Sequence, residues 1–180
     1  VQSSSGSLVG VKIYLNACLM FNTLFSYLNC PQGYSLTTQV YYGSYTYKSQ
    51  FLPHVTIMIV TDEYPGYEDL RPIFDQLGYG FMVPNKDTII IDGEILVNEG
   101  PDDSLFKFIE AHEVAHILLG HDGPRNEQEE IEADLGAYLI LNKWGYKDSI
   151  KMLLKNFRFR HGVKFDEKML DNVKNRLQGM

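Results

Sequence analysis

The chain has 180 residues, 44% hydrophobic and 22% charged, which is the composition of a globular protein large enough for one domain. Its net charge of −7 excludes general nucleic-acid binding, because a phosphate backbone requires a basic surface. The two cysteines, Cys18 and Cys30, make no disulfide framework and match no zinc finger, so we expect a reducing, cytoplasmic compartment.

The N-terminal part is predicted to be a leader followed by a helical segment. Val1–Ser7 has the composition of a flexible leader. Leu8–Leu28 is apolar, but Lys12 and two asparagines interrupt it, and each is costly in the middle of a membrane. We therefore expect a buried amphipathic helix within residues 8–35, with a membrane anchor or an export signal as the alternative.

Residues 36–100 are predicted to form mainly a sheet. Runs rich in Tyr, Thr, Val and Ile indicate strands. The expected strands are Thr38–Tyr47 with a turn near Gly43, His54–Val60, and Thr88–Asp92, which the Asp92-Gly93 pair closes. Between the last two, a short helix is expected at Glu68–Leu77, ended by Gly78.

Residues 101–180 have helical periodicity throughout. The first helix begins near Asp102 and stops at Gly120; the others are expected at about Glu127–Lys143, Lys147–Phe157 and Asp166–Leu177. A small sheet followed by helices predicts an α+β fold. The whole chain is expected to be a single domain with its functional site in the helical part.

The first of these helices carries the pattern H-E-x-x-H as His112-Glu113-Val114-Ala115-His116. Positions i and i+4 lie on one helical face, so the two imidazoles can bind one Zn²⁺. Glu113 lies about a quarter turn away, where its carboxylate can reach a zinc-activated water without binding the metal. The alternative is a helix with two histidines that bind no metal.

A third ligand is expected from the next helix, where Glu127, Glu129, Glu130 and Glu132 compete. Glu130, Ala133, Asp134 and Ala137 share one helical face, and Gly136 lies beside it. These small residues allow a close approach to the histidine helix, so we favour Glu130 as the ligand. Asp134, one turn later, is then expected to accept the free N–H of a histidine ligand.

These residues carry a resemblance to known enzymes. "HEVAH" followed by "EIEAD" resembles the gluzincin metallopeptidases, and "HEVAHILLGH" with "EIEADLGAYLI" is similar to the ImmA/IrrE-type and, more distantly, the HtpX-like families. The resemblance implies a zincin-like fold, in which the edge strand of a small twisted sheet lies over the H-E-x-x-H helix. It would make Thr88–Asp92 that edge strand, binding an extended peptide by strand addition.

Further polar residues have no assigned role in the sequence. His121 follows Gly120 and is expected to face away from the histidine pair unless the chain doubles back; the alternatives are that it caps the helix or acts as a fourth or alternative ligand. His54 and His161 are expected to be strand or surface residues. Candidates for stabilising an oxyanion are Tyr138, Tyr146, Arg125 and His161, and the pattern does not choose among them.

The leading hypothesis is a zinc metalloendopeptidase that hydrolyses a protein or peptide substrate. Its metal ligands would be His112, His116 and Glu130, with Glu113 as the general base and Asp134 as a supporting residue. One alternative is a zinc-bound regulatory or binding module of the same fold with little or no peptidase activity. Another is a structural protein without a metal.

Overall fold

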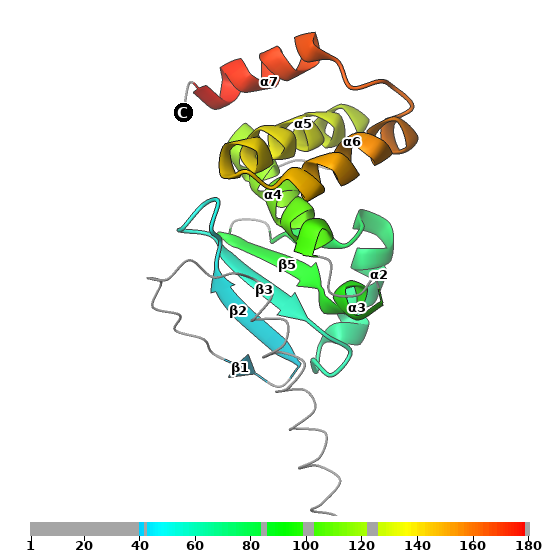
Figure 1. Cartoon of the computed structure of the whole chain (residues 1–180). Helices are drawn as coiled ribbons and strands as arrows, with labels where there is room; N and C mark the ends of the chain where they lie inside the picture. The colour runs from blue at the N-terminus through cyan, green and yellow to red at the C-terminus, as the bar shows by residue number, and fades with distance from the viewer. Residues whose placement is uncertain (1–39, 42, 84–85, 99–102, 122–125, 179–180) are drawn as a thin grey trace, which may run out of the picture. The chain divides into compact units, whose positions relative to one another are not determined.

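The computed structural model describes residues 40–41, 43–83, 86–98, 103–121 and 126–178, whose course Figure 1 shows. The chain divides into two units, Val1–Ser35 and Leu36–Met180, and every described residue belongs to the second. The leader predicted at residues 1–7 and the helix predicted within residues 8–35 therefore lie outside the described part. Among the described helices, none is both long enough and apolar enough to cross a membrane.

The described residues form an α+β structure that begins with a five-stranded mixed sheet in the order β1-β2-β3-β5-β4. The strands are β1 (Val40–Tyr41), β2 (Ser44–Lys48), β3 (Thr56–Val60), β4 (Gly80–Met82) and β5 (Thr88–Asp92). β3 and β5 run parallel, whereas the other neighbours are antiparallel. Alternate isoleucines of β5, Ile89 and Ile91, are fully buried, as expected when one face of a strand packs on the core.

The sequence prediction for the sheet edge is wrong. Thr88–Asp92 is a strand, β5, but it lies between β3 and β4. The edge on this side is β4, which pairs antiparallel with β5 through Gly80↔Ile91, Phe81↔Ile90 and Met82↔Ile89. β4 was not predicted from the sequence, because its three residues are too few to show the alternation that identifies a strand.

Two helices complete this part of the chain, one before β4 and one after β5 in the sequence. α2 (Tyr67–Leu77) ends at Gly78, as the sequence predicted, and its Phe74 ring packs against Phe81 of β4. The Asp92-Gly93 pair does not simply close β5, because it begins a further helix, α3 (Gly93–Asn98). Asp92 Oδ1 accepts a hydrogen bond of 3.0 Å from the backbone N–H of Glu94, which caps this helix.

Four helices follow: α4 (Asp103–Leu119), α5 (Glu127–Trp144), α6 (Lys147–His161) and α7 (Glu167–Gln178). α4 contacts β4 and β5 as well as α5, α6 and α7, so it lies between the sheet and the other helices (Figure 1). Ala111, Val114 and Ala115 of α4 are all inaccessible to solvent. A helix that is apolar on most sides is stable only when it is enclosed in this way.

A buried carboxylate ties α4 to the segment that follows β2. Glu110 is inaccessible to solvent, and its Oε1 accepts hydrogen bonds from the Ser49 hydroxyl (2.7 Å) and from the Gln50 backbone N–H (3.2 Å). Burial raises the pKa of Glu110, although Lys107 and Ser49 oppose this rise. The orientation of α4 relative to the sheet therefore depends on a polar contact as well as on apolar packing.

Gly136 allows α4 and α5 to approach closely. A Cβ atom at this position would lie 2.7 Å from the Cβ of Ala115, which is closer than two carbon atoms can be. Both atoms are fixed to backbone, so the two helices would have to move apart. The small residues that the sequence analysis noted beside Glu130 therefore set the distance between the two helices.

We expect Gly136→Ala to destabilise the protein by about 1–3 kcal/mol, because overpacking outweighs the roughly 1 kcal/mol that Ala gains over Gly in a helix. Denaturant unfolding followed by circular dichroism measures this change. Asn142→Ala, at an exposed position of the same helix, is the control and should be neutral or slightly stabilising. A Gly136→Ala protein as stable as the wild type would show that moving the helices apart costs no more than the roughly 1 kcal/mol that Ala gains.

Candidate metal centre

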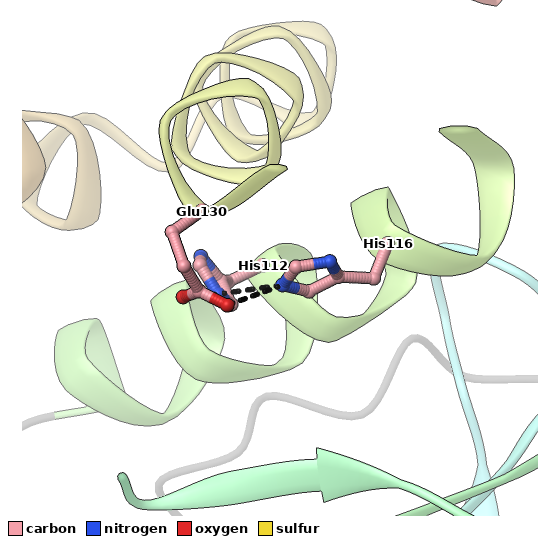
Figure 2. A group of neighbouring side chains, drawn as sticks. All are labelled: His112, His116 and Glu130. Atoms are coloured by element: carbon pink, nitrogen blue, oxygen red, sulfur yellow. Dashed lines mark hydrogen bonds and ion pairs between the residues drawn. The ribbon is translucent and has the colours of Figure 1, made fainter. Parts of the chain in front are cut away.

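Three predicted ligands come together where α5 crosses α4. His112 and His116 lie on the same face of α4, and Glu130 extends toward both rings from the first turn of α5 (Figure 2). Their ligand atoms all lie within 4.8 Å of one another. Both histidines are buried, whereas the Glu130 side chain is 23% exposed. His112 and His116 precede Glu130 by eighteen and fourteen positions in the sequence, yet the three side chains converge on one point.

The spacing of the three donors fits a tetrahedral metal ion. His112 Nε2 and His116 Nε2 are 3.1 Å apart, and each lies 3.4 Å from one oxygen of Glu130. Around a tetrahedral ion with metal–donor distances of about 2.0–2.1 Å, neighbouring donors stand about 3.3 Å apart. Two imidazoles and one carboxylate also match the donors of catalytic zinc sites, which leave a fourth position open. The residues present therefore fit Zn²⁺.

Asp134 lies directly behind His112, as its place on the Glu130 face predicted. Its Oδ1 is 2.8 Å from His112 Nδ1 and accepts a hydrogen bond of 2.8 Å from Arg160, while its Oδ2 is 2.6 Å from His161 Nε2. Burial alone would raise the Asp134 pKa, but the hydrogen bonds from His112 and His161 and the charge of Arg160 hold it well below the usual range. Asp134 is therefore an anion, and it directs Nε2 of His112 toward Glu130.

The surroundings of His112 favour positive charge. Burial lowers its pKa, but hydrogen bonds to Asp134 and Glu130, together with the charges of Asp134 and Glu113, raise the pKa to about 9 in the metal-free protein. At neutral pH the metal-free ring therefore holds a second proton, which an ion bound at Nε2 would replace. The contribution of this proton to the stability of the metal-free protein is complete below the ordinary pKa of 6.5 and is lost as the pH rises through about 9.

We expect zinc binding at pH 7.5 to release about one proton per ion, because His112 must lose its second proton to act as a ligand. The release should decline as the pH rises above 9. Calorimetric titration in buffers with different ionisation enthalpies measures the number of protons released. Binding enthalpies that do not depend on the buffer at pH 7.5 would contradict the raised pKa of His112.

Glu113 is buried between α4 and the sheet edge. It is 2% exposed, and a Cβ atom built at Gly80 of β4 would lie 3.6 Å from Glu113 Cγ. Glu113 directly follows the ligand His112 in α4, and its charge contributes to the raised pKa of His112. A Cβ atom at Gly80 would also lie only 2.9 Å from Ile109 Cγ2 of α4, so the absence of a side chain at Gly80 allows β4 to pack closely against α4.

His121 does not face away from the histidine pair, so that expectation is wrong. The chain doubles back at Gly120, which has a φ of 71°, and the backbone N–H of His121 donates to the carbonyl of His116 (3.0 Å). His121 Nδ1 lies 3.0 Å from His116 Nδ1, on the side of the His116 ring opposite to Nε2. Burial lowers the pKa of His121 despite its bond to Glu132, whose carboxyl pKa lies below its usual value.

The remaining candidates are not among the converging ligands. Glu127 is exposed, Glu129 is only partly buried, and Glu132 contacts His121. His161 is buried against Asp134, contrary to the surface or strand position expected from the sequence, while His54 is exposed in a turn before β3. Sequence reasoning missed His161 and Arg160 because neither has a motif and both come from α6.

Three of the four oxyanion candidates can be placed. The Tyr146 hydroxyl donates to Gln50 Oε1 (2.9 Å), Tyr138 packs its ring against Phe165, and His161 is bonded to Asp134. Arg125 lies outside the described residues. The described contacts therefore single out none of these side chains for an oxyanion.

Comparisons of the chain with protein-family models, with curated proteins and with solved structures find no match.

Proposed function

We propose that the chain is a zinc-dependent metallopeptidase of the zincin-like type, with His112, His116 and Glu130 as metal ligands. The observation that carries this proposal is the convergence of three donors at tetrahedral spacing beside the buried carboxylate of Glu113. Helix propensity alone requires neither this spacing nor this combination of residue types. The combination is the one that metal-assisted hydrolysis needs.

A zinc ion held by these residues supplies Lewis acidity, which lowers the pKa of a coordinated water toward about 7 and polarises a carbonyl group. The protein supplies the rest of the chemistry. Glu113 accepts a proton from the water while the water oxygen bonds to the peptide carbonyl carbon. The same carboxyl group then gives this proton to the amide nitrogen as the C–N bond breaks. Asp134 holds the ring of His112 in position throughout.

The sheet edge beside Glu113 suggests how an extended peptide would bind. β4 has β5 on one side and no neighbour on the other in the described sheet, and Gly80 of β4 adjoins Glu113. A peptide added as a strand along β4 would thus pass close to the general base. This assigns to β4 the role in substrate binding that the sequence analysis gave to Thr88–Asp92.

The proposal is tested by measuring zinc content and peptide cleavage on the same preparation. We expect about one zinc ion per wild-type chain, and hydrolysis of a quenched-fluorescent peptide library that a chelator abolishes. Glu113→Gln should keep the zinc and the fold but lose at least a hundredfold in cleavage rate, because an amide cannot accept the proton.

The control is Glu94→Gln, which changes a carboxylate of α3 and should leave both zinc content and cleavage unchanged. Cleavage by Glu113→Gln at the wild-type rate would remove Glu113 from the mechanism. A wild-type protein that holds zinc but cleaves no peptide would support the regulatory module instead, and one that binds no zinc would support the structural alternative.

A further inference from the structure

The metal centre continues behind His116 into a chain of polar contacts that ends on the last helix. His116 Nδ1 lies 3.0 Å from His121 Nδ1, and His121 Nε2 lies 3.2 Å from Glu132 Oε2. Glu132 in turn pairs with the guanidinium of Arg176 on α7. His116 and His121 are both buried, and Glu132 is largely so.

The protons of these contacts can be arranged in only one way when Nε2 of His116 binds a metal. The His116 ring then keeps its proton on Nδ1 and must donate it, so Nδ1 of His121 must accept. His121 consequently carries its own proton on Nε2 and donates it to the carboxylate of Glu132. Glu132 thus selects the tautomer of His121, and this tautomer is the only one that accepts a proton from His116.

Arg176 holds this arrangement from a distant part of the sequence. One nitrogen of its guanidinium pairs with Glu132 on α5, and the other donates a hydrogen bond of 2.9 Å to the carbonyl of Leu119, in the last turn of α4. Arg176 therefore contacts the end of the helix that carries His116, just before the turn at Gly120 that places His121 against His116. The link joins α4 and α5 to a helix that begins at Glu167.

The two histidine ligands consequently have different support. His112 donates to Asp134, an anion that is itself bonded to Arg160 and His161 on α6. His116 meets a neutral imidazole, which transmits the effect of Glu132 and Arg176. A carboxylate directly behind each ligand would place two anions beside Glu130 and Glu113, whereas an intervening imidazole keeps the second charge one ring further away.

We propose that His121, Glu132 and Arg176 are positioning residues that fix the orientation and tautomer of His116 and so make α7 part of the metal centre. This inference rests on the zinc site under Proposed function but not on peptide hydrolysis. It predicts that changes in the last helix alter zinc affinity although α7 contributes no ligand. Partners that hold such a ligand typically account for about 10–100-fold in metal affinity.

Zinc affinity of the full chain, measured by competition with a chromogenic chelator, tests this inference. His121→Phe keeps an aromatic ring but removes the acceptor, and Glu132→Ala removes the group that selects the tautomer. Each should weaken zinc binding by about 10–100-fold. Arg176→Met should weaken it several-fold, because Glu132 remains in place but loses its partner. Lys174→Met, the control, removes the same charge from an exposed position of α7 and should change nothing.

A second readout separates positioning from general stability. Imidazole ¹⁵N shifts should show the His121 proton on Nε2 in the zinc-loaded chain. The metal-free chain should keep a preference for this tautomer in Glu132→Gln, whose amide oxygen still accepts, but lose the preference in Glu132→Ala. The zinc affinity of Glu132→Gln should accordingly lie closer to the wild-type value than that of Glu132→Ala. Wild-type zinc affinity in a folded His121→Phe or Glu132→Ala protein, or a His121 proton on Nδ1 in the wild type, would overturn the inference.

The outcomes distinguish this inference from the proposed function. In one outcome, the wild type binds zinc but cleaves no peptide, while the variants bind zinc more weakly as described. That result would support the positioning residues and contradict only the peptidase. Variants that bind zinc as tightly as an active wild type would contradict only the positioning residues. A wild-type chain without zinc affinity would overturn both.

Discussion

Replacing Glu130 by Ala is expected to weaken zinc binding by more than a hundredfold, a larger loss than the 10–100-fold typical of removing a supporting residue. Glu130 provides one of three donors, so its loss leaves two imidazoles at 3.1 Å and a coordination sphere completed only by water. Equilibrium dialysis of the purified variant against buffered zinc measures the change. His116→Ala should cause a loss of the same order.

Glu129→Ala is the matched control, because it removes an equal charge one position away in the same turn of α5. If Glu130 acts as a ligand, Glu129→Ala should keep near-wild-type affinity, and an equal loss in both variants would indicate a general electrostatic effect. Glu130→Ala with full zinc content would move the third ligand to another carboxylate. Glu132, one such alternative, is already engaged by His121 and Arg176.

Asp134→Ala is expected to reduce both stability and zinc affinity. The side chain is almost completely buried and accepts from His112, His161 and Arg160, so its removal leaves three donors, two of them on buried imidazoles, without their acceptor. Breaking a buried pair in this way typically costs about 3–5 kcal/mol. Zinc affinity should fall by about 10–100-fold, because the ring of His112 is no longer held. Asp134→Asn should lose less, since its amide oxygen still accepts one bond.

The loss should also depend on pH in a defined direction. The folded-state pKa of Asp134 lies below its ordinary value of 3.8, so its contribution to stability is complete above that value and is lost as the pH falls through the folded pKa. Denaturant unfolding of metal-free protein should therefore show the largest difference between wild type and Asp134→Ala near neutral pH, with a smaller difference below pH 3.8. Asp148→Ala, at the exposed start of α6, should show little change at any pH. Equal stability of Asp134→Ala and wild type near pH 7 would contradict the role of this cluster.

Several contacts of the site depend on short-range periodicity, which can be read from sequence. His112 and His116 are four residues apart on one helix, as are Glu130 and Asp134 on the next, so each pair shares a face wherever its helix packs. The bounds of α2, α4 and α5 differ by a few residues at most from those predicted, because glycines or capping residues mark several of their ends. The observation that Gly136 accompanies Glu130 also depends only on helical spacing.

Other features depend on residues that are distant in sequence. β4 is a strand because β5 supplies its hydrogen bonds, and its three residues do not show a strand pattern by themselves. The predicted edge strand was therefore wrong, although the strand itself was predicted correctly. His161 and Arg160 reach Asp134 because α6 contacts both α4 and α5, and Arg176 reaches Glu132 across forty-four positions. No local pattern encodes such contacts.

The sequence by itself therefore determined which side chains could bind a metal, because ligands at helical spacing share a face in any packing of the helix. It also determined that α4 must be enclosed, since this helix is apolar on most sides. Only the tertiary structure decided which strand lies at the edge beside Glu113 and which groups stand behind each histidine. Those contacts depend on the distance between α4 and α5, on the turn at Gly120 and on the return of α6 and α7 to the same site. Local propensity favours the turn at Gly120, but only the free energy of packing the whole unit fixes the distance between α4 and α5 and the positions of α6 and α7.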